Sequence, residues 1–490
     1  MGMTAVPVFG AYIAGTFVDT ARKRELRSPY DGRVVAVVSD ASAAELEVAL
    51  AAAESAFART RALSSQVRAQ ICTDVAQGMA AHRDELALSI CDEAGKPIGD
   101  ARAEVDRAIF CFELAAAEAQ RHAVEGQLLP MDLRPPGVGR MGLLRRVPLG
   151  PIAAISPFNF PLNLAVHKVA PALAVGNPVV LKPASQTPTP VLRLAQIIQS
   201  TAWPKEAFSV VPASRTVADR LVSDPRPQLL TFTGSAAVGW DMKARAGKKR
   251  VVLELGGNAA VLIDASISDA DLDNIVTKLI YGAFSYAGQK CISVQRIYVV
   301  APPSSTLFDQ FCRRFVAAAQ AVRQGDPRDP DVLVGPMIDE GNAIRIERWV
   351  DEAQQAGARL LCGGPRRGSL VPPHVLTDVP DRAQIVCEEA FGPVCTIARV
   401  DSFDDGVAAI NASRFGLQAA VFTRDLGHSL RAFDELVVGA VILNDAPSFR
   451  LDHMPYGGVK ESGLGREGIR CAIEDMTEPR LLVTGTLPPL

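Results

Sequence analysis

Apolar residues in the first third of the chain recur at helical spacing. This spacing, with much Ala and Leu, predicts helices at Ala43–Thr60, Arg68–Ala87 and Glu104–Arg121. The prolines and glycine of the segment 130–137 interrupt the pattern, and Arg140–Leu149 reads as an extended segment. The N-terminal third is therefore expected to be mostly helical and to end in an irregular stretch.

From Pro151 onward the pattern alternates between short apolar runs and helical periods. Strands are predicted at Ile152–Ile155, Pro178–Lys182, Leu229–Phe232 and Arg250–Glu254, with helices at Leu162–Ala174 and Val191–Gln199. A second region of this kind runs from about Asn258 to Lys460, with a helix at Leu272–Tyr286, a strand at Val294–Val300 and a helix at Leu307–Gln324. This rhythm predicts an α/β protein with a doubly wound parallel sheet, which binds ligands at the carboxyl ends of its strands.

Composition narrows the class of protein. The 490 residues exceed the size of one domain, and 51 Lys and Arg against 54 Asp and Glu give a net charge of −3. That balance argues against nucleic acid as a partner, and the absence of a long apolar run argues against a membrane span. The N-terminus shows no secretory signal, and the nine cysteines are odd in number with no CxxC pair. We therefore expect a cytoplasmic protein without a disulfide framework or a metal site.

Four segments carry candidate chemistry. Gly234 and Ser235 lie between a strand and a helix, where free N–H groups bind phosphates, although GxGxxG is absent and a plain glycine-rich turn remains an alternative. Cys291 follows small residues in YAGQKCIS and is a candidate nucleophile or a buried structural cysteine. Glu254 in LELGG is a candidate general base or an ion-paired carboxylate. Asn159 in SPFNFP is a candidate oxyanion donor or a turn former.

Seven motifs then occur in an order and spacing that resemble the NAD(P)-dependent aldehyde dehydrogenase superfamily over nearly the whole chain. They are SPFNFPLN, VVLKPASQTP, FTGSAAVG, LELGGN, GQKC, EEAFGPV and PYGGVKESGLGREG. The resemblance implies that Cys291 attacks the aldehyde carbonyl, giving a thiohemiacetal and then a thioester. Asn159 and the backbone N–H of Cys291 would hold the oxyanion, and Glu254 would activate water. The presence of Glu254 favours hydrolysis over transfer to coenzyme A.

The resemblance also implies a cofactor site for NAD or NADP. The matching positions are Ile155, Ser156, Phe158, Lys182, Ser185, Gly234, Ser235, Leu255, Glu389 and Phe391. NAD-strict relatives usually carry Glu three residues after the lysine, where it repels a 2′-phosphate. Ser185 occupies that place here, so we expect NADP to be used, alone or together with NAD.

Three cations map to the substrate funnel of the family: Arg107, Lys290 and Arg450. Cations at these places suit a small anionic aldehyde, whether phosphorylated, phosphonated, sulfonated or carboxylated. In the alternative interpretation they are tied up elsewhere. The pairings would be Arg107 with Glu104 or Asp106 and Arg450 with Asp452, while Lys290 would face solvent.

Two other functions stay open at this point. The sequence around CISVQR resembles the lactaldehyde dehydrogenase branch of the superfamily, so a short neutral hydroxyaldehyde is an alternative substrate. A non-catalytic structural protein with the same fold is the alternative of another class. The resemblance further implies a nucleotide-binding domain (residues 1–126 and 148–258), a catalytic domain (259–460) and an oligomerisation element (127–147 and 475–490) that forms a homodimer or homotetramer.

Overall fold

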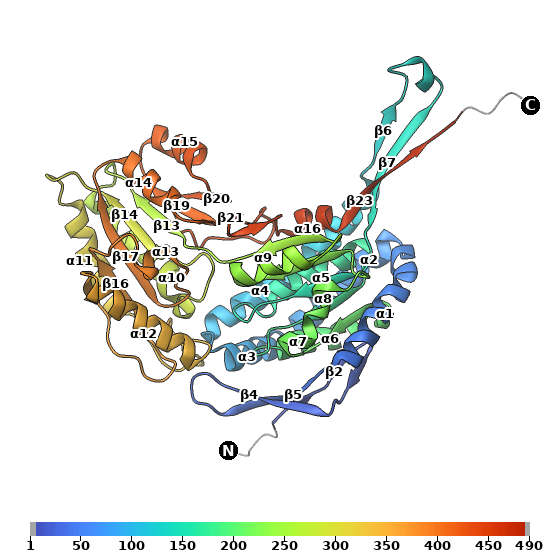
Figure 1. The fold of residues 1–490 in the computed structure, drawn as a ribbon, viewed down its shortest axis with the longest axis horizontal. Helices are drawn as coiled ribbons and strands as arrows, with labels where there is room; N and C mark the ends of the chain where they lie inside the picture. Colours follow the sequence, from blue (N-terminus) through green and yellow to red (C-terminus); the bar gives the residue numbers. More distant parts are fainter. Residues whose placement is uncertain (1–5, 486–490) are drawn as a thin grey trace, which may run out of the picture.

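The computed structural model describes residues 6–485, so the first residues of the segment inspected for a signal and the last five of the predicted oligomerisation element lie outside it. Two α/β bodies lie side by side, and a narrow β arm projects from the first of them (Figure 1). None of the helices formed by residues 6–485 has both the length and the hydropathy that crossing a membrane requires.

The first body is built on an eight-stranded sheet of order β22-β12-β11-β8-β9-β10-β2-β3. Its strands are β2 (Ala11–Ile13), β3 (Thr16–Val18), β8 (Ile152–Ile155), β9 (Val179–Lys182), β10 (Phe208–Val210), β11 (Leu229–Thr233), β12 (Arg250–Glu254) and β22 (Gly463–Leu464). The five central strands are parallel, and the sequence predicted four of them but not β10; β2, β3 and β22 add antiparallel strands at both ends. The chain order reverses between β8 and β11, which is the place where such sheets bind ligands.

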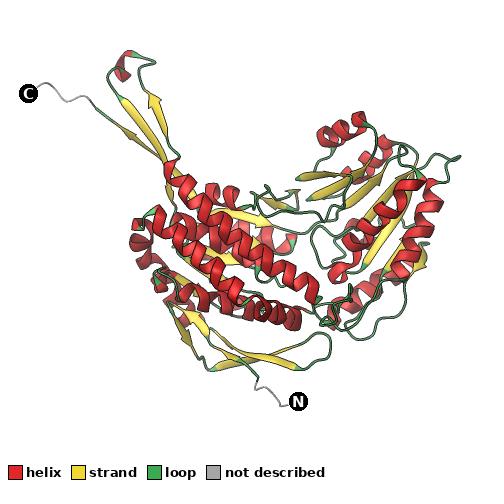
Figure 2. Cartoon of the chain, turned by 180° about the vertical axis from the view of Figure 1, so that it is seen from behind, coloured by secondary structure: helices red, strands yellow, loops and turns green. Residues whose placement is uncertain are grey.

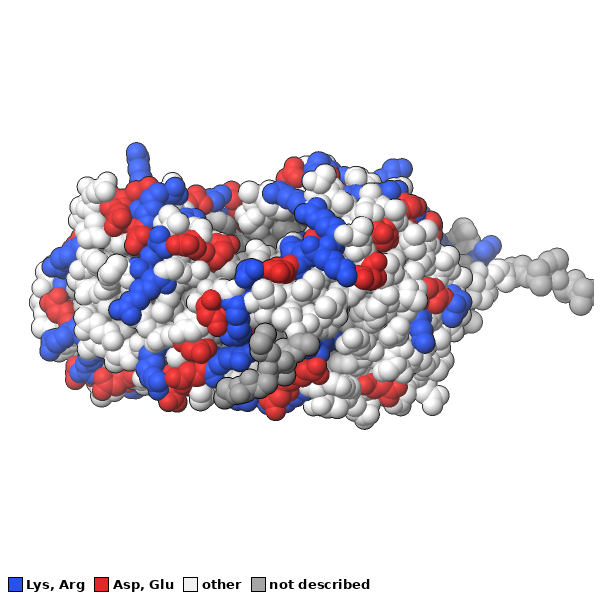
Figure 3. Space-filling view, turned by 90° about the horizontal axis from the view of Figure 1, so that it is seen from below, with Lys and Arg blue, Asp and Glu red and all other residues white. Residues whose placement is uncertain are grey.

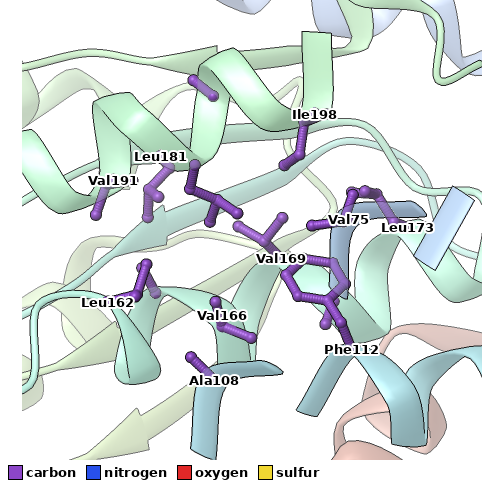
Figure 4. Packing of buried hydrophobic residues seen from close by; sticks show 14 of the residues in the cluster. Val75, Ala108, Phe112, Leu162, Val166, Val169, Leu173, Leu181, Val191 and Ile198 are labelled. Carbon is purple, nitrogen blue, oxygen red and sulfur yellow. The ribbon is translucent and has the colours of Figure 1, made fainter. Parts of the chain in front are cut away.

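Helices cover both faces of this sheet. They are α1 (Ala43–Ala62), α2 (Ser65–Ala81), α3 (Arg83–Ala94), α4 (Ile98–Val124), α5 (Asn163–Val175), α6 (Thr189–Gln199), α7 (Arg215–Ala218), α8 (Arg220–Ser223), α9 (Ala236–Arg245) and α16 (Ile469–Asp475). Every residue of α5 is buried, because this helix lies between the sheet and α2 and α4. Figure 4 shows Val166, Val169 and Leu173 of α5 packed against Val75 and Phe112. α4 is longer than predicted, since it begins directly after Pro97, which fits a helix start but not a helix interior.

The second body contains a seven-stranded sheet of order β15-β16-β17-β14-β13-β19-β20. Its strands are β13 (Ala260–Ile263), β14 (Arg296–Val300), β15 (Arg359–Cys362), β16 (His374–Thr377), β17 (Val394–Val400), β19 (Gln418–Phe422) and β20 (Ala440–Leu443), and its longer helices are α10 (Leu272–Phe284), α11 (Leu307–Gln320), α12 (Glu340–Gln355), α14 (Phe403–Asn411) and α15 (Leu426–Glu435). α10 ends two residues before the predicted Tyr286, and β14 begins two residues after Val294. After Lys460 the chain returns to the first body as β22 and α16.

Three smaller sheets complete the described chain, one of them the antiparallel pair of β18 (Phe415–Gly416) and β21 (Val459–Lys460). The projecting arm is an antiparallel sheet of β6 (Gln127–Pro130), β7 (Met141–Pro148) and β23 (Thr477–Val483). The third sheet joins β1 (Val8–Phe9), β5 (Val34–Asp40) and β4 (Arg22–Arg27) at the lower side of the first body. Seen from behind, the long helices and this lower sheet lie on the same body as the arm (Figure 2). Figure 3 shows the underside, where basic and acidic side chains are interspersed.

Candidate functional site

The predicted site residues lie where the carboxyl ends of the first sheet meet the second body. The strand registers pair Ile155 with both Lys182 and Phe232, and Thr233 with Glu254, so four strands end at one edge. Cys291 precedes β14 of the second sheet. The parallel alignment of the strands therefore brings residues that are up to about a hundred positions apart in sequence to one edge.

Cys291 is held by an unusual backbone segment. After α10 the chain passes through Tyr286 (φ 54°), Ala287 (φ 53°) and Gly288 (φ 67°), three consecutive residues in the left-handed region. Such strain persists only where the surrounding structure imposes it, and it gathers at functional sites. A Cβ at Gly257 would lie 2.1 Å from the carbonyl oxygen of Cys291, so only glycine allows this approach.

Cys291 is half-buried. Burial raises its pKa to about 12, and nearby Glu389 adds to the effect, whereas a hydrogen bond with Tyr456 opposes it. The Sγ atom lies 2.9 Å from the Tyr456 hydroxyl. A thiolate here requires donors and cations around it, because burial alone disfavours the charge.

Asn159 stands beside this loop. Its Nδ2 donates one hydrogen bond of 3.0 Å to the carbonyl of Gln289, which fixes the Asn159 amide next to Cys291. The second N–H of this amide takes no part in that hydrogen bond. The backbone N–H of Cys291 donates to no group among residues 6–485. Two donors are thus available at the nucleophile, as an oxyanion site requires.

Glu254, at the end of β12, is fully buried, and its Oε1 has no hydrogen-bond partner within the described part of the chain. Burial raises its pKa well above the usual value, and the neighbouring charge of Glu467 raises it further. A carboxylate whose pKa is raised is a stronger base than an ordinary one, which suits a general base.

Glu467 keeps its own charge, although burial opposes it, because Lys168 and Arg450 lower its pKa to about 2. Its carboxylate accepts hydrogen bonds from Lys168 at 3.1 Å and from Arg450 at 2.9 Å. Sequence reasoning missed both Lys168 and Glu467, since nothing in their local pattern distinguishes them from ordinary charged residues.

A cavity of about 260 Å³ lies between the sheet edge and α9. Its lining includes Ile155, Lys182, Phe232, Val238 and Met242. Ser235 is the N-cap of α9, and its side chain makes no capping bond, so the first N–H groups of the helix remain available to an anion. An apolar slot beside an anion-binding helix start fits an adenosine and its pyrophosphate.

The other predicted cofactor residues extend from this cavity toward Cys291. The Glu389 carboxylate accepts the backbone N–H of Gly257 at 2.9 Å, and burial raises its pKa to about 7. The rings of Phe158 and Phe391 meet edge to face, 5.9 Å apart. Ser156 and Leu255 are buried at the same edge, and the Ser156 hydroxyl has no partner among residues 6–485. These groups fit a dinucleotide.

Arg24 of β4 joins Lys182 and Ser185 at the outer end of the groove. Its guanidinium donates to the Ser185 carbonyl at 2.5 Å and forms two hydrogen bonds with Asp40. Burial lowers the pKa of Lys182 to about 8, and the positive charge of Arg24 lowers it further. Sequence reasoning missed Arg24 because β4 lies about 160 residues from Ser185 in the chain.

The three predicted funnel cations have different surroundings. Arg107 does not pair with Glu104 or Asp106; it makes two hydrogen bonds of 3.0 and 2.7 Å with Asp452. Arg450 pairs with Glu467 instead of Asp452, and its guanidinium lies 3.6 Å from the centre of the Tyr456 ring.

Lys290 is buried, not solvent-facing. Its Nζ donates to Ser285 at 2.5 Å and to the carbonyl of Tyr281 at 3.3 Å. Burial lowers its pKa to about 8. Its ammonium is thus held by groups at the end of α10.

His167 of α5 connects Arg450 with Asp452, the carboxylate that binds Arg107. The His167 Nε2 lies 2.9 Å from Asp452 and 3.3 Å from Arg450. Cys111 completes a buried trio with His167 and Asp452 whose ligand-type atoms lie within 4.8 Å of one another. Two guanidinium groups already surround this trio, so it is better described as an ion-pair network than as a metal site.

Known proteins that resemble this chain also indicate its family. Residues 17–482 match the model of the aldehyde dehydrogenase family. The 3-sulfolactaldehyde dehydrogenase of Priestia aryabhattai is 38% identical over 482 residues, 98% of this chain and 99% of the relative.

Two solved structures share the fold over almost the full chain. Aldehyde dehydrogenase 21 of Physcomitrella patens, in complex with the reaction product succinate, superposes with a TM-score of 0.95 at 42% identity and covers 99% of this chain and 100% of its own. A glyceraldehyde-3-phosphate dehydrogenase of Methanocaldococcus jannaschii, complexed with NADP, gives 0.89 at 35% identity, with 95% and 100% covered. The chain therefore belongs to the aldehyde dehydrogenase family and is an oxidoreductase that uses NAD or NADP.

Proposed function

We propose that the enzyme oxidises small aldehydes that carry one negative charge, a carboxylate or a sulfonate, to the corresponding acids. The observation that carries this proposal is the pair Arg107 and Arg450, of which Arg450 lies over the ring of Tyr456, the residue in contact with Cys291. Arg450 is only 7% exposed, and its Nε has no partner among the described residues. A buried, unpaired guanidinium N–H is costly unless a ligand accepts from it.

The charges around the pair favour a monoanion over a phosphate. Arg107, Arg450 and Lys168 face two ionised carboxylates, Asp452 and Glu467. Burial opposes ionisation of Asp452, but hydrogen bonds from His167 and Arg107 hold its pKa well below the usual range. One net positive charge remains, which balances one negative charge on the substrate.

The chemistry follows from the positions of the catalytic groups. The Cys291 thiolate adds to the aldehyde carbonyl, and the oxygen of the thiohemiacetal lies against the Asn159 amide and the Cys291 N–H. Bound NAD or NADP supplies the hydride acceptor. The acyl group is then held on Cys291 as a thioester. Glu254 takes a proton from water, the hydroxide adds to the thioester carbonyl, and the Cys291 thiolate leaves as the acid is released.

Related proteins support an anionic substrate. Of the three named relatives, one is named for a sulfonated aldehyde, one contains succinate, a carboxylated product, and one is named for a phosphorylated aldehyde. The test is kcat/KM for carboxylated, sulfonated, phosphorylated and neutral aldehydes of equal chain length, each with both cofactors. We expect the two monoanions to lead by at least about 100-fold over the neutral aldehyde and by at least about tenfold over the phosphorylated one; a leading neutral hydroxyaldehyde would support the lactaldehyde alternative instead.

We propose NADP as the preferred cofactor. Three features support this choice: Lys182, the uncharged Ser185, and Arg24 between them and Asp40. The Nη atoms of Arg24 each carry a second N–H beyond those used toward Ser185 and Asp40. A 2′-phosphate would meet two cations at this end of the groove and no carboxylate at position 185. Equal kcat/KM for NAD and NADP would contradict the preference.

We propose that the arm binds a second copy of the chain. The outer edges of β20 and β23 are the ends of their sheets, and exposed edges need cover. α15 exposes Leu426 (74%), Leu430 (60%) and Phe433 (74%) in one stripe next to β20. The arm offers matching apolar residues, with Leu128 65% and Leu482 62% exposed. Light scattering should give a dimer or tetramer mass.

We also propose a cytoplasmic location. All nine cysteines are free thiols, including buried ones that approach no partner as a disulfide. A reducing compartment keeps thiols in this state. Fractionation of the producing cells tests this proposal.

A further inference from the structure

We propose that Tyr456 is a positioning residue of the nucleophile: its hydroxyl donates a hydrogen bond to the Cys291 thiolate, and Arg450, stacked on its ring, strengthens that donor. This role goes beyond the proposed substrate class and does not depend on which aldehyde is oxidised.

The first support is the contact itself. The hydroxyl oxygen of Tyr456 lies 2.9 Å from the Sγ atom of Cys291, and Tyr456 is 3% exposed. Among residues 6–485 no other side chain forms a hydrogen bond with this sulfur. Once the sulfur has lost its proton it can only accept, so the phenol must be the donor. Burial raises the pKa of Tyr456 well above its usual value, with a further contribution from Cys291, so the phenol keeps its proton.

The second support is the cation above the ring. The Arg450 guanidinium lies 3.6 Å from the centre of the Tyr456 ring, well inside the range of a cation–π contact. A cation over the ring face withdraws electron density and makes the hydroxyl a stronger donor. Arg450 is held in this position from the other side by Glu467, at 2.9 Å.

The third support is the position of the ring. Tyr456 packs with Ile292 and Leu417 in a small buried cluster against Cys291. Its backbone is fixed by two hydrogen bonds with the backbone of Glu467. A phenol held on both sides can direct one hydroxyl at one atom. The same bond would stabilise the thiolate when it leaves the thioester.

The test is the pH dependence of Cys291 alkylation by iodoacetamide in the full-length, cofactor-free protein. Modification is followed on the Cys291 peptide by mass spectrometry, because the chain has nine free cysteines. Tyr456→Phe keeps the ring and removes only the hydroxyl. Because burial already raises the pKa of Cys291 to about 12, the readout is the rate below the midpoint, and loss of a hydrogen bond to a charged group predicts that alkylation between neutral and moderately alkaline pH slows about 3- to 10-fold.

Tyr298→Phe is the matched control, since its hydroxyl contacts Arg296 instead of the nucleophile. It should leave the profile unchanged. A Tyr456→Phe profile that coincides with the wild type would overturn the proposal, whatever happens to kcat. An unfolding temperature of Tyr456→Phe equal to that of the wild type shows that the comparison is made between folded proteins.

The contribution of Arg450 is tested with Arg450→Lys, which keeps the charge but loses the flat guanidinium. It should slow the same alkylation by less than Tyr456→Phe does, as a smaller downward shift of the rate. In the Tyr456→Phe background this shift should largely disappear, because the phenol carries the effect. A shift of equal size in both backgrounds would overturn the link through Tyr456.

Discussion

Replacement of Arg107 by Leu tests the anion site most sharply. The side chain lies on α4, is 30% exposed and binds Asp452 through two hydrogen bonds. A hydrogen bond between charged groups contributes about 1.5–3 kcal/mol, and partial exposure places Arg107 in the lower half of that range. At about 1.4 kcal/mol per tenfold, kcat/KM for a carboxylated aldehyde should fall about 10- to 50-fold.

The comparison must separate substrate binding from stability. Arg107→Leu leaves the buried Asp452 carboxylate with one partner fewer, and breaking such a pair destabilises a protein. The double variant Arg107→Leu/Asp452→Asn removes both charges together and should recover most of the lost stability. Arg102→Leu, on the same helix but paired with Asp84 at the surface, controls for the loss of a helical arginine.

The assay is the ratio of kcat/KM for a carboxylated aldehyde to that for a neutral aldehyde of equal length. Taking the ratio cancels losses of active enzyme. The single and double variants should both lower the ratio at least tenfold, while Arg102→Leu should keep it within twofold. If Arg107→Leu lowers both substrates equally, Arg107 supports only the fold and the anion site is refuted.

Three further variants test the general base, the 2′-phosphate site and the interface between two copies of the chain. Glu254→Gln should lower kcat about 10²- to 10⁴-fold and leave a thioester on Cys291 that intact mass spectrometry detects. Because the pKa of Glu254 is raised and the base must be ionised, deacylation by the wild-type enzyme should accelerate with rising pH. The variant should lose this pH dependence. Arg24→Ala should weaken calorimetric binding of 2′,5′-ADP about 10-fold and leave 5′-AMP unchanged, with Lys23→Ala, which faces Asp19, as the control; equal losses for both nucleotides would argue against 2′-phosphate recognition. Phe433→Glu should reduce the mass in light scattering to that of the monomer, and an unchanged mass would place the interface elsewhere.

Local patterns in the sequence predict much of the fold. The strand Ile152–Ile155 has the same bounds in the structure, and α5 and β12 lie where apolar runs and glycine stops place them. The end of α10 was predicted too late, because the left-handed residues Tyr286 and Ala287 are imposed by the packing around Cys291 and leave no mark in the periodicity. The antiparallel end strands of the first sheet likewise come from distant segments.

The catalytic candidates were found because each stands in a distinctive motif. The contacts that shift the pKa values of these residues were not found from the sequence. Arg107 and Asp452 are 345 residues apart, so neither local spacing nor charge pattern indicates their pairing. Arg24 and Tyr456 were not identified for the same reason. A charge on an edge strand and a tyrosine in a glycine-rich loop acquire their roles only through the tertiary fold.

We propose that this aldehyde dehydrogenase selects a single negative charge on its substrate. The most direct test of this proposal is kcat/KM of the wild-type enzyme with NADP for a four-carbon carboxylated aldehyde and for the neutral four-carbon aldehyde. Two guanidinium contacts predict a preference of at least about 100-fold for the carboxylated substrate. Rates within threefold of each other, or a clear preference for a phosphorylated aldehyde, would contradict the account.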